Sequence, residues 1–257
     1  MKHQARKRFG QHFLTDTGIL TQLTGEIRPL PDDHMVEIGP GLGAMTAWIL
    51  KHIKHLHVIE IDRDLAERLR TGQWKDRLTV HEMDVLNFDF ATLPSPLRVV
   101  GNLPYNISSP ILFALLPHVD RIVDQHFMLQ KEVIDRMVAK PGTSDYGRLS
   151  VMLQAYYDME LLFDVPPESF SPPPRVMSAI VRMEPRSKAQ RDEVPQTVFS
   201  KIVSAAFAQK RKMLRNNWAD LVPAEIAEHA GVAMTARAEE VSCEQFIQIA
   251  KALQHTI

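Results

Sequence analysis

Residues 35–44 read MVEIGPGLGA, an apolar strand pattern that runs directly into a glycine-rich turn. Glycine allows the backbone to turn tightly and to approach a ligand closely. Gly39, Gly41 and Ala44 also fit the spacing of the dinucleotide-binding pattern G-x-G-x-x-G/A, and residues 46–52 have a helical pattern. The stretch therefore predicts the first strand, turn and helix of an open α/β sheet.

Acidic residues end the next two predicted strands, residues 56–62 and 78–84. A carboxylate at Glu60, about 20 residues after the turn, can bind both hydroxyls of a ribose. That fits a nicotinamide cofactor or S-adenosylmethionine, because both carry adenosine. Asp84 either accepts a hydrogen bond from the adenine amine of a cofactor or caps the following turn. Together the segments predict a doubly wound sheet with its polar groups on one edge.

A polar and aromatic stretch, VGNLPYN at residues 100–106, follows the next apolar strand. Asn102 offers a side-chain carbonyl oxygen as an acceptor. The Leu103–Pro104 link fixes the backbone and removes an N–H, so that backbone carbonyls can face a ligand. Tyr105 offers a ring on which a base can stack. These groups suit the exocyclic amine of adenine or cytosine and would stabilise the positive charge that develops on it. An ordinary proline turn is the alternative.

Two further segments are candidates for covering that site. Basic and aromatic residues interleave from Lys7 to Leu14, which favours a segment that folds over a site rather than a basic tail. A triple proline at 172–174 makes a stiff extended loop that cannot join a central sheet. Phe170, just before it, either closes the second face of a bound base or anchors the loop in the core.

Charge is balanced overall but segregated locally. Thirty basic and 31 acidic side chains give a net charge of −1, so bulk charge does not indicate a nucleic-acid binder. Basic runs are usually solvated faces. Two such runs in a nearly neutral protein nevertheless favour a polyanionic partner. The runs contain Arg6, Lys7 and Arg8, and Lys210, Arg211, Lys212 and Arg215.

The C-terminal part has a different pattern from the rest. Residues 184–196 are polar and flanked by prolines, which predicts a linker. Every later segment has helical spacing, namely residues 198–208, 211–218, 224–230 and 243–254. We therefore expect two domains, residues 1–186 and a small helical domain at residues 187–257.

Cys243 is the only cysteine, which excludes an internal disulfide and a cysteine-based zinc site and favours a reducing compartment. The N-terminus lacks the apolar core of a signal peptide, and no apolar run approaches about 18 residues. His52, His55 and His57 lack further ligands at metal-binding spacing. We expect a cytoplasmic protein with no membrane span and no metal.

Taken in order, these segments resemble the ribosomal RNA adenine dimethyltransferases, the KsgA-type enzymes of bacteria. The resemblance covers nearly the whole chain, and eight motifs in the right order make it specific. They are KRFGQxFL at 7–14, EIGPGLG at 37–43, VIEIDRD at 58–64, GNLPYNIS at 101–108, FMLQKEV at 127–133, YGRLSV at 146–151, FxPPPxV at 170–176 and FxQxRKxLRN at 207–216.

The resemblance implies a Rossmann-like methyltransferase domain, dependent on S-adenosylmethionine, with a small all-helical C-terminal domain that binds RNA. It implies dimethylation of N6 in two adjacent adenosines near the 3′ end of 16S ribosomal RNA in the 30S subunit. Tyr105 and Phe170 would hold the base, while Asn102 and the backbone of Leu103 or Pro104 orient N6. We expect a monomer. By matched position, the cofactor pocket would contain His12, Leu14, Gly39, Gly41, Glu60, Asp84 and Asn102.

Three alternatives share parts of this pattern. A nicotinamide dehydrogenase would have the glycine turn and Glu60, but it leaves residues 102–105, the triple proline and the basic helical domain unexplained. A 23S ribosomal RNA methyltransferase of the antibiotic-resistance type would use the same Asn102 stretch. A 30S assembly factor that does not need catalysis would share the RNA-binding features.

Overall fold

The computed structural model describes residues 11–209 and 211–254. The chain divides into two compact units, which we describe separately. Unit 1 comprises Met1–Ile134 and Glu160–Glu184, and unit 2 comprises Asp135–Met159 and Pro185–Ile257. Unit 2 therefore draws on a middle segment of the chain as well as on its C-terminal part. The assignment of separate functions to residues 1–186 and 187–257 stays a prediction.

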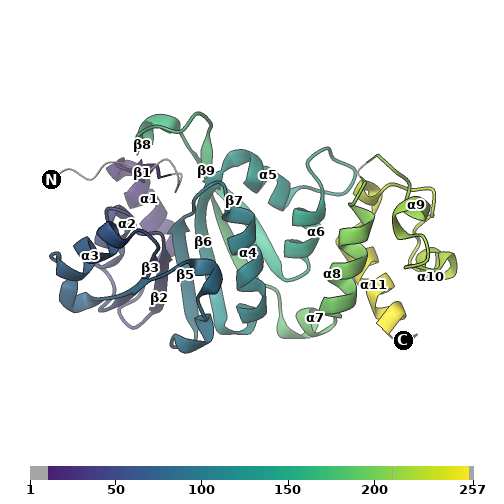
Figure 1. Ribbon diagram of the computed structural model, residues 1–257, viewed down its shortest axis with the longest axis horizontal. Coiled ribbons are helices and arrows are strands. Elements are labelled where there is room, and N and C mark those ends of the chain that lie inside the picture. The colour runs from purple at the N-terminus through teal and green to yellow at the C-terminus, as the bar shows by residue number, and fades with distance from the viewer. Residues whose placement is uncertain (1–10, 210, 255–257) are drawn as a thin grey trace. The chain divides into compact units, whose positions relative to one another are not determined.

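A seven-stranded sheet with the order β4-β3-β2-β5-β6-β9-β7 forms the centre of the fold (Figure 1). Neighbouring strands from β4 to β6 are parallel, and β9 is antiparallel to β6. This confirms the predicted Rossmann-like sheet. The strands are β2 His34–Ile38, β3 Leu56–Glu60, β4 Leu78–Glu82, β5 Leu97–Asn102, β6 Ile122–Gln130, β7 Tyr157–Val165 and β9 Ser178–Pro185.

The strand order reverses between β2 and β5, which creates a switch point beside the ends of these two strands. Met35 and Val36 on β2 are both fully buried, as expected for a parallel strand covered on both faces. Ile38 pairs with Ile59 on one side and with Gly101 on the other, so the carboxyl ends of β2, β3 and β5 are level. Ligands of open α/β sheets bind at such a switch point.

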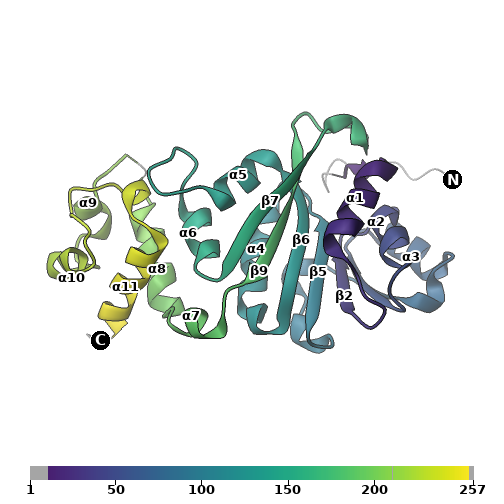
Figure 2. The ribbon, with the colours of Figure 1, turned by 180° about the vertical axis from the view of Figure 1, so that it is seen from behind.

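Helices cover both faces of the sheet in unit 1: α4 lies toward the viewer in Figure 1 and α1 toward the viewer in Figure 2. Asp16 caps α1 by accepting hydrogen bonds from the N–H groups of Gly18 and Ile19. The helices are α1 Thr17–Ile27, α2 Ala44–Ile49, α3 Arg63–Thr71, α4 Ser108–Leu115 and α5 Lys131–Val138, which runs into unit 2. Short 3₁₀ turns are η2 Lys75–Arg77, η3 Val85–Asn87, η4 Phe90–Thr92, η5 Leu116–Arg121 and η6 Pro167–Ser169.

A second, two-stranded sheet joins the N-terminal segment to the triple-proline region. Strand β1 (Phe13–Leu14) pairs antiparallel with β8 (Phe170–Ser171). The N–H of Thr15 extends this pairing by donating to the carbonyl of Ser169 at 2.8 Å. Residues 11–14 are therefore held in a defined place, as expected for a segment that folds over a site. Residues 7–10 of the predicted segment lie outside the described residues.

Unit 2 packs helices around a core that includes Phe199, Trp218 and Phe246, each at most 1% exposed. The indole N–H of Trp218 donates to the carbonyl of Ile202 at 3.0 Å, which satisfies its one polar atom. This confirms the predicted helical C-terminal region. The helices are α6 Arg148–Gln154, α7 Lys188–Asp192, α8 Gln196–Ala206, α9 Leu214–Trp218, α10 Ala224–His229 and α11 Cys243–Gln254, with a 3₁₀ turn, η7, at Ala238–Glu240.

Two local predictions in this part of the chain were wrong. The segment predicted as a linker contains α7, because Ser187 caps a helical turn by accepting from the N–H of Gln190. The helix predicted from residue 211 begins only at Leu214. Its start is delayed because Met213 forms a β-bridge with Arg237 and the N–H of Leu214 donates to the carbonyl of Ala236.

Candidate active site

A pocket in unit 1 lies where β2, β3 and β5 end, at the switch point of the sheet. Its empty space is about 990 Å³ when the part open to solvent is counted. The structure thus brings together segments that are far apart in the sequence. The predicted residues that line it are His12, Leu14, Gly39, Gly41, Glu60, Asp84, Asn102, Leu103, Pro104 and Tyr105.

The glycine turn forms the wall nearest β2. Gly39, Gly41 and Gly43 have φ values of 67°, 58° and 84°, which side chains other than glycine rarely adopt. A Cβ added at Gly41 would lie only 3.0 Å from the Phe13 ring. The residue types at these positions are therefore required by the backbone, and the turn presents main-chain atoms to the pocket.

Glu60 ends β3 and reaches back across the turn. Its two carboxylate oxygens accept hydrogen bonds from the N–H groups of Gly41, at 3.1 Å, and Asp62, at 2.9 Å. Burial raises the pKa of this carboxyl, while those backbone donors oppose the rise. Each carboxylate oxygen has a second lone pair. Glu60 therefore keeps acceptor capacity for a hydroxyl of a ligand.

Glu37 is a second buried carboxyl that the sequence-based prediction did not select. It lines the pocket and is 2% exposed, and the Thr46 hydroxyl donates to it at 2.5 Å. Burial raises the pKa of Glu37 to about 7; the hydrogen bond from Thr46 opposes the rise and the nearby charge of Glu60 adds to it. An acid inside an otherwise apolar strand was the available signal.

Asp84 both lines the pocket and caps η3, since its carboxylate accepts from the N–H of Leu86 at 3.0 Å. The interpretation of Asp84 as a cap is therefore confirmed, and its contact with a cofactor stays a prediction. Ile61 and Met83 also line the pocket, although they are 48% and 36% exposed. Exposed apolar side chains beside a carboxylate offer apolar contact to a heterocyclic ring, and these two residues were not among those predicted from the sequence.

Asn102 is fixed by the N-terminal segment. Its side-chain N–H₂ donates to the backbone carbonyl of His12 at 2.9 Å, which leaves the amide oxygen as its acceptor end. The N–H of Leu103 is used by the sheet, donating to the carbonyl of Met128 at 3.1 Å, while the carbonyl of Pro104 accepts from Ile107. The Asn102 stretch is therefore a rigid turn that presents an oriented acceptor.

Tyr105 is held from two sides. Its hydroxyl lies 2.6 Å from the Ser178 hydroxyl, and its ring stacks on the imidazole of His12 with centroids 5.7 Å apart and planes at 21°. Burial raises the pKa of the Tyr105 hydroxyl, so it stays protonated at neutral pH. Its ring is therefore a fixed platform.

Phe170 has a different environment from Tyr105. Its side chain is 3% exposed and belongs to the hydrophobic core that also contains Leu14. It is not among the described residues that line the pocket. This burial fits the alternative in which Phe170 anchors the loop, and its predicted contact with a base stays a prediction.

The predicted RNA-binding residues can be placed only in part. Arg6, Lys7, Arg8 and Lys210 lie outside the described residues. Arg211, Lys212 and Arg215, which we call the 211–215 basic cluster, are all exposed in unit 2. Their contact with RNA stays a prediction.

Within residues 11–209 and 211–254, no group of three or more His, Cys, Asp or Glu side chains could hold a metal ion. Among the helices of the same residues, none is both long enough and apolar enough to span a membrane.

Comparison with solved structures supports the fold. A dimethyladenosine transferase from Plasmodium falciparum superposes with a TM-score of 0.82 at 24% identity, over 95% of this chain and 98% of that one. The 23S rRNA methyltransferase ErmE gives a TM-score of 0.68 at 26% identity, over 94% and 99%.

Comparison with curated sequences identifies the family. Ribosomal RNA small subunit methyltransferase A of Bordetella petrii is 57% identical over 98% of this chain and 96% of its own length. The protein of the same name from Nitrosospira multiformis is 54% identical over 97% and 96%. The family model for ribosomal RNA adenine dimethylase matches residues 2–255. With this match across the chain and the Asn102 stretch at the switch-point pocket, the protein belongs to the ribosomal RNA adenine dimethylase family.

Proposed function

We propose that this enzyme transfers methyl groups from S-adenosylmethionine to N6 of two adjacent adenosines near the 3′ end of 16S ribosomal RNA in the 30S subunit. Each adenosine receives two methyl groups, in the course of ribosome biogenesis. The relatives at 54–57% identity are named small subunit methyltransferases. The observation that carries the proposal is that the oriented amide of Asn102 and the Tyr105 ring, both held by His12, line the same pocket as Glu60 and the glycine turn.

The residues of the pocket fit S-adenosylmethionine. Glu60 keeps acceptor capacity for the hydroxyls of a ribose, and Ile61 and Met83 offer apolar walls for an adenine. Gly39 and Gly41 let the chain approach a ligand without a side chain between them. Bound there, S-adenosylmethionine supplies an electrophilic methyl group on a sulfonium. We expect Asp84 to accept from the adenine amine while its other hydrogen bond caps η3.

The chain's own part in the reaction is to hold and orient the base. We propose that the target adenosine leaves its stack, at a cost of a few kcal/mol, and stacks on Tyr105. Asn102 Oδ1 accepts from N6, because its N–H₂ end is already bonded to His12. The nitrogen becomes positive as it attacks, and a fixed amide dipole aimed at it stabilises that charge.

The direct test is methylation of isolated substrates. The protein is incubated with labelled S-adenosylmethionine and unmethylated 30S particles, with naked 16S RNA and 50S particles as the other arms, and modified nucleotides are mapped by mass. We expect dimethyladenosine at two adjacent positions in the 30S arm only. Asn102→Ala should lose about 10²-fold or more in kcat, with RNA binding retained. Near-normal turnover of that variant would refute the role of Asn102.

The same assay examines two other functions. The likeness to ErmE favours 23S ribosomal RNA as a second candidate, and label in the 50S arm would support it. Tight 30S binding without transfer of label would support an assembly factor. The proposal also includes action in the cytoplasm. It includes a monomeric state as well, which light scattering of the purified protein would check.

A further inference from the structure

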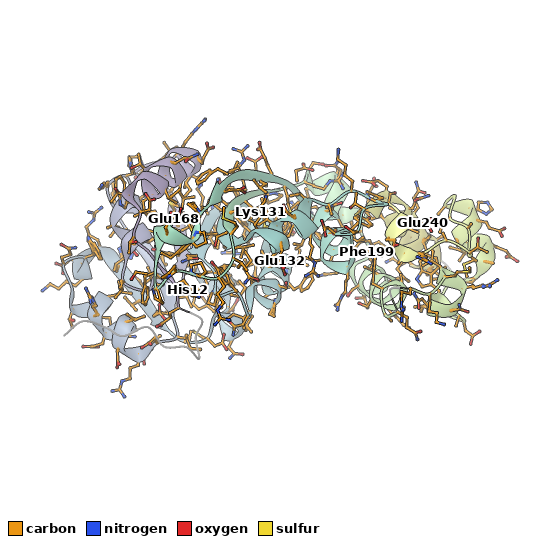
Figure 3. All side chains as sticks on the ribbon, turned by 90° about the horizontal axis from the view of Figure 1, so that it is seen from above. His12, Lys131, Glu132, Glu168, Phe199 and Glu240 are labelled. Carbon is orange, nitrogen blue, oxygen red and sulfur yellow. The ribbon has the colours of Figure 1, made fainter. Side chains whose placement is uncertain are left out.

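His12 contacts two parts of the site that are far from it in sequence, the Asn102 stretch and the triple-proline loop. Its backbone carbonyl accepts from Asn102, its ring stacks on Tyr105, and its Nδ1 lies 2.8 Å from the carbonyl oxygen of Pro172. Figure 3 labels His12 together with Glu168, which lies on the η6 turn before β8. The backbone of His12 thus contacts Asn102 at the end of β5, while its side chain contacts Tyr105 and the triple-proline loop.

The imidazole of His12 is oriented by its contact with the triple-proline loop. A carbonyl oxygen only accepts hydrogen bonds, so Nδ1 carries the hydrogen and donates it to Pro172. Strand β1 fixes the backbone on one side, since Phe13 and Leu14 pair with β8. The backbone beside His12 and the imidazole at the end of its side chain are therefore both held in place.

The fixed position of the His12 ring restricts which face of the Tyr105 ring a base can stack on. A base inserted between two rings needs about 7 Å between them, twice the usual carbon–carbon contact distance. The centroids of His12 and Tyr105 are 5.7 Å apart, which is too close for a base to enter between these two rings. The hydroxyl of Tyr105 is held by Ser178 at 2.6 Å, which limits rotation of the ring. A base can therefore stack only on the opposite face.

We propose that His12 is a positioning residue for the target base: its side chain packs against the Tyr105 ring and holds that ring in the orientation in which the adenine stacks on it. The inference rests on the proposed function and assigns His12 a role through Tyr105. A ring held in advance loses less conformational entropy when a base binds, which favours productive stacking. The backbone carbonyl of residue 12 can accept the hydrogen bond from Asn102 whatever side chain the residue carries.

Three variants separate the parts of this role. His12→Ala removes both the stack and the hydrogen bond to Pro172, His12→Phe keeps a ring but loses that hydrogen bond, and His12→Gln keeps a hydrogen-bonding group but loses the ring. His52→Ala, an exposed histidine outside the pocket, is the matched control. Steady-state kcat and KM with 30S particles are measured beside the Kd for S-adenosylmethionine.

We expect His12→Ala and His12→Gln to lower kcat/KM for 30S about threefold to tenfold, the range that an aromatic pair contributes. His12→Phe should lose less than His12→Ala and His12→Gln, because it keeps a ring that can stack on Tyr105. The control, His52→Ala, should stay within about twofold of the wild type. The Kd for S-adenosylmethionine should change less than about twofold in every variant, which also reports that each is folded.

The inference would be overturned if kcat/KM were unchanged in His12→Ala. It would also be overturned if His12→Gln kept the wild-type kcat/KM and His12→Phe did not, because the side chain would then only support the proline loop. A weaker Kd for S-adenosylmethionine with unchanged use of 30S would also overturn it, by moving the side chain to the cofactor. A wild type that methylates no RNA would refute the proposed function itself, whatever the variants do.

Discussion

Glu37→Gln is expected to remove a pH-dependent loss of stability that the wild type carries. The carboxyl of Glu37 is 2% exposed and accepts a hydrogen bond from the Thr46 hydroxyl. Burial raises its pKa from 4.5 to about 7, so the folded protein holds this proton more tightly than the unfolded chain does. Glutamine keeps an oxygen that accepts from Thr46 but does not ionise.

The sign and size of the effect follow from proton linkage. Because the folded state binds the extra proton, its contribution to stability is fully present below pH 4.5 and is lost as the pH rises to 7 and above. The difference between 4.5 and about 7 corresponds to about 3 kcal/mol at 25 °C. Glu37→Gln should therefore gain about 3 kcal/mol relative to the wild type across that window.

Urea denaturation of both proteins from pH 4.5 to 8, without cofactor, measures this difference. The quantity of interest is how the free energy of unfolding of the variant minus that of the wild type changes with pH. Glu184→Gln, at an exposed position, is the matched control and should show no such trend. A difference that stays constant over the whole window would mean that Glu37 titrates normally, and the reasoning from burial would be wrong.

Two further outcomes are expected. Gly43→Ala should lower the free energy of unfolding by about 2–4 kcal/mol, since φ is 84° and the new Cβ would lie 2.6 Å from the Trp74 ring. Gly142→Ala, with φ 82° and nothing within 4 Å of the new Cβ, should lose only the backbone part of about 1–2 kcal/mol. Equal losses for the two variants in chemical denaturation would contradict this account. Neutralising the 211–215 basic cluster should reduce the slope of log K against log salt for 30S binding by about 2–3, and an unchanged slope would mean that these side chains do not contact phosphates.

The strands and the glycine turn could be predicted because their signals are local. Met35 and Val36 begin an apolar strand whatever it pairs with, and the glycines that follow allow positive φ values at a turn. The Asn102 stretch was found for the same reason, since a strand end followed by Leu103–Pro104 is visible in a few residues. The start of α9 was misjudged, because a β-bridge from Arg237 decides where that helix begins.

The order of the strands along the chain, the glycine turn and the polar groups at the strand ends could all be recognised from local sequence patterns. The tertiary structure decided which residues act together: the amide of Asn102 meets the carbonyl of His12 across 90 positions, and the ring of Tyr105 meets both His12 and Ser178. It also decided that Glu37 is buried enough to raise its pKa. The reason is physical: a hydrogen bond, a stack or a desolvated carboxyl depends on neighbours brought close by the fold.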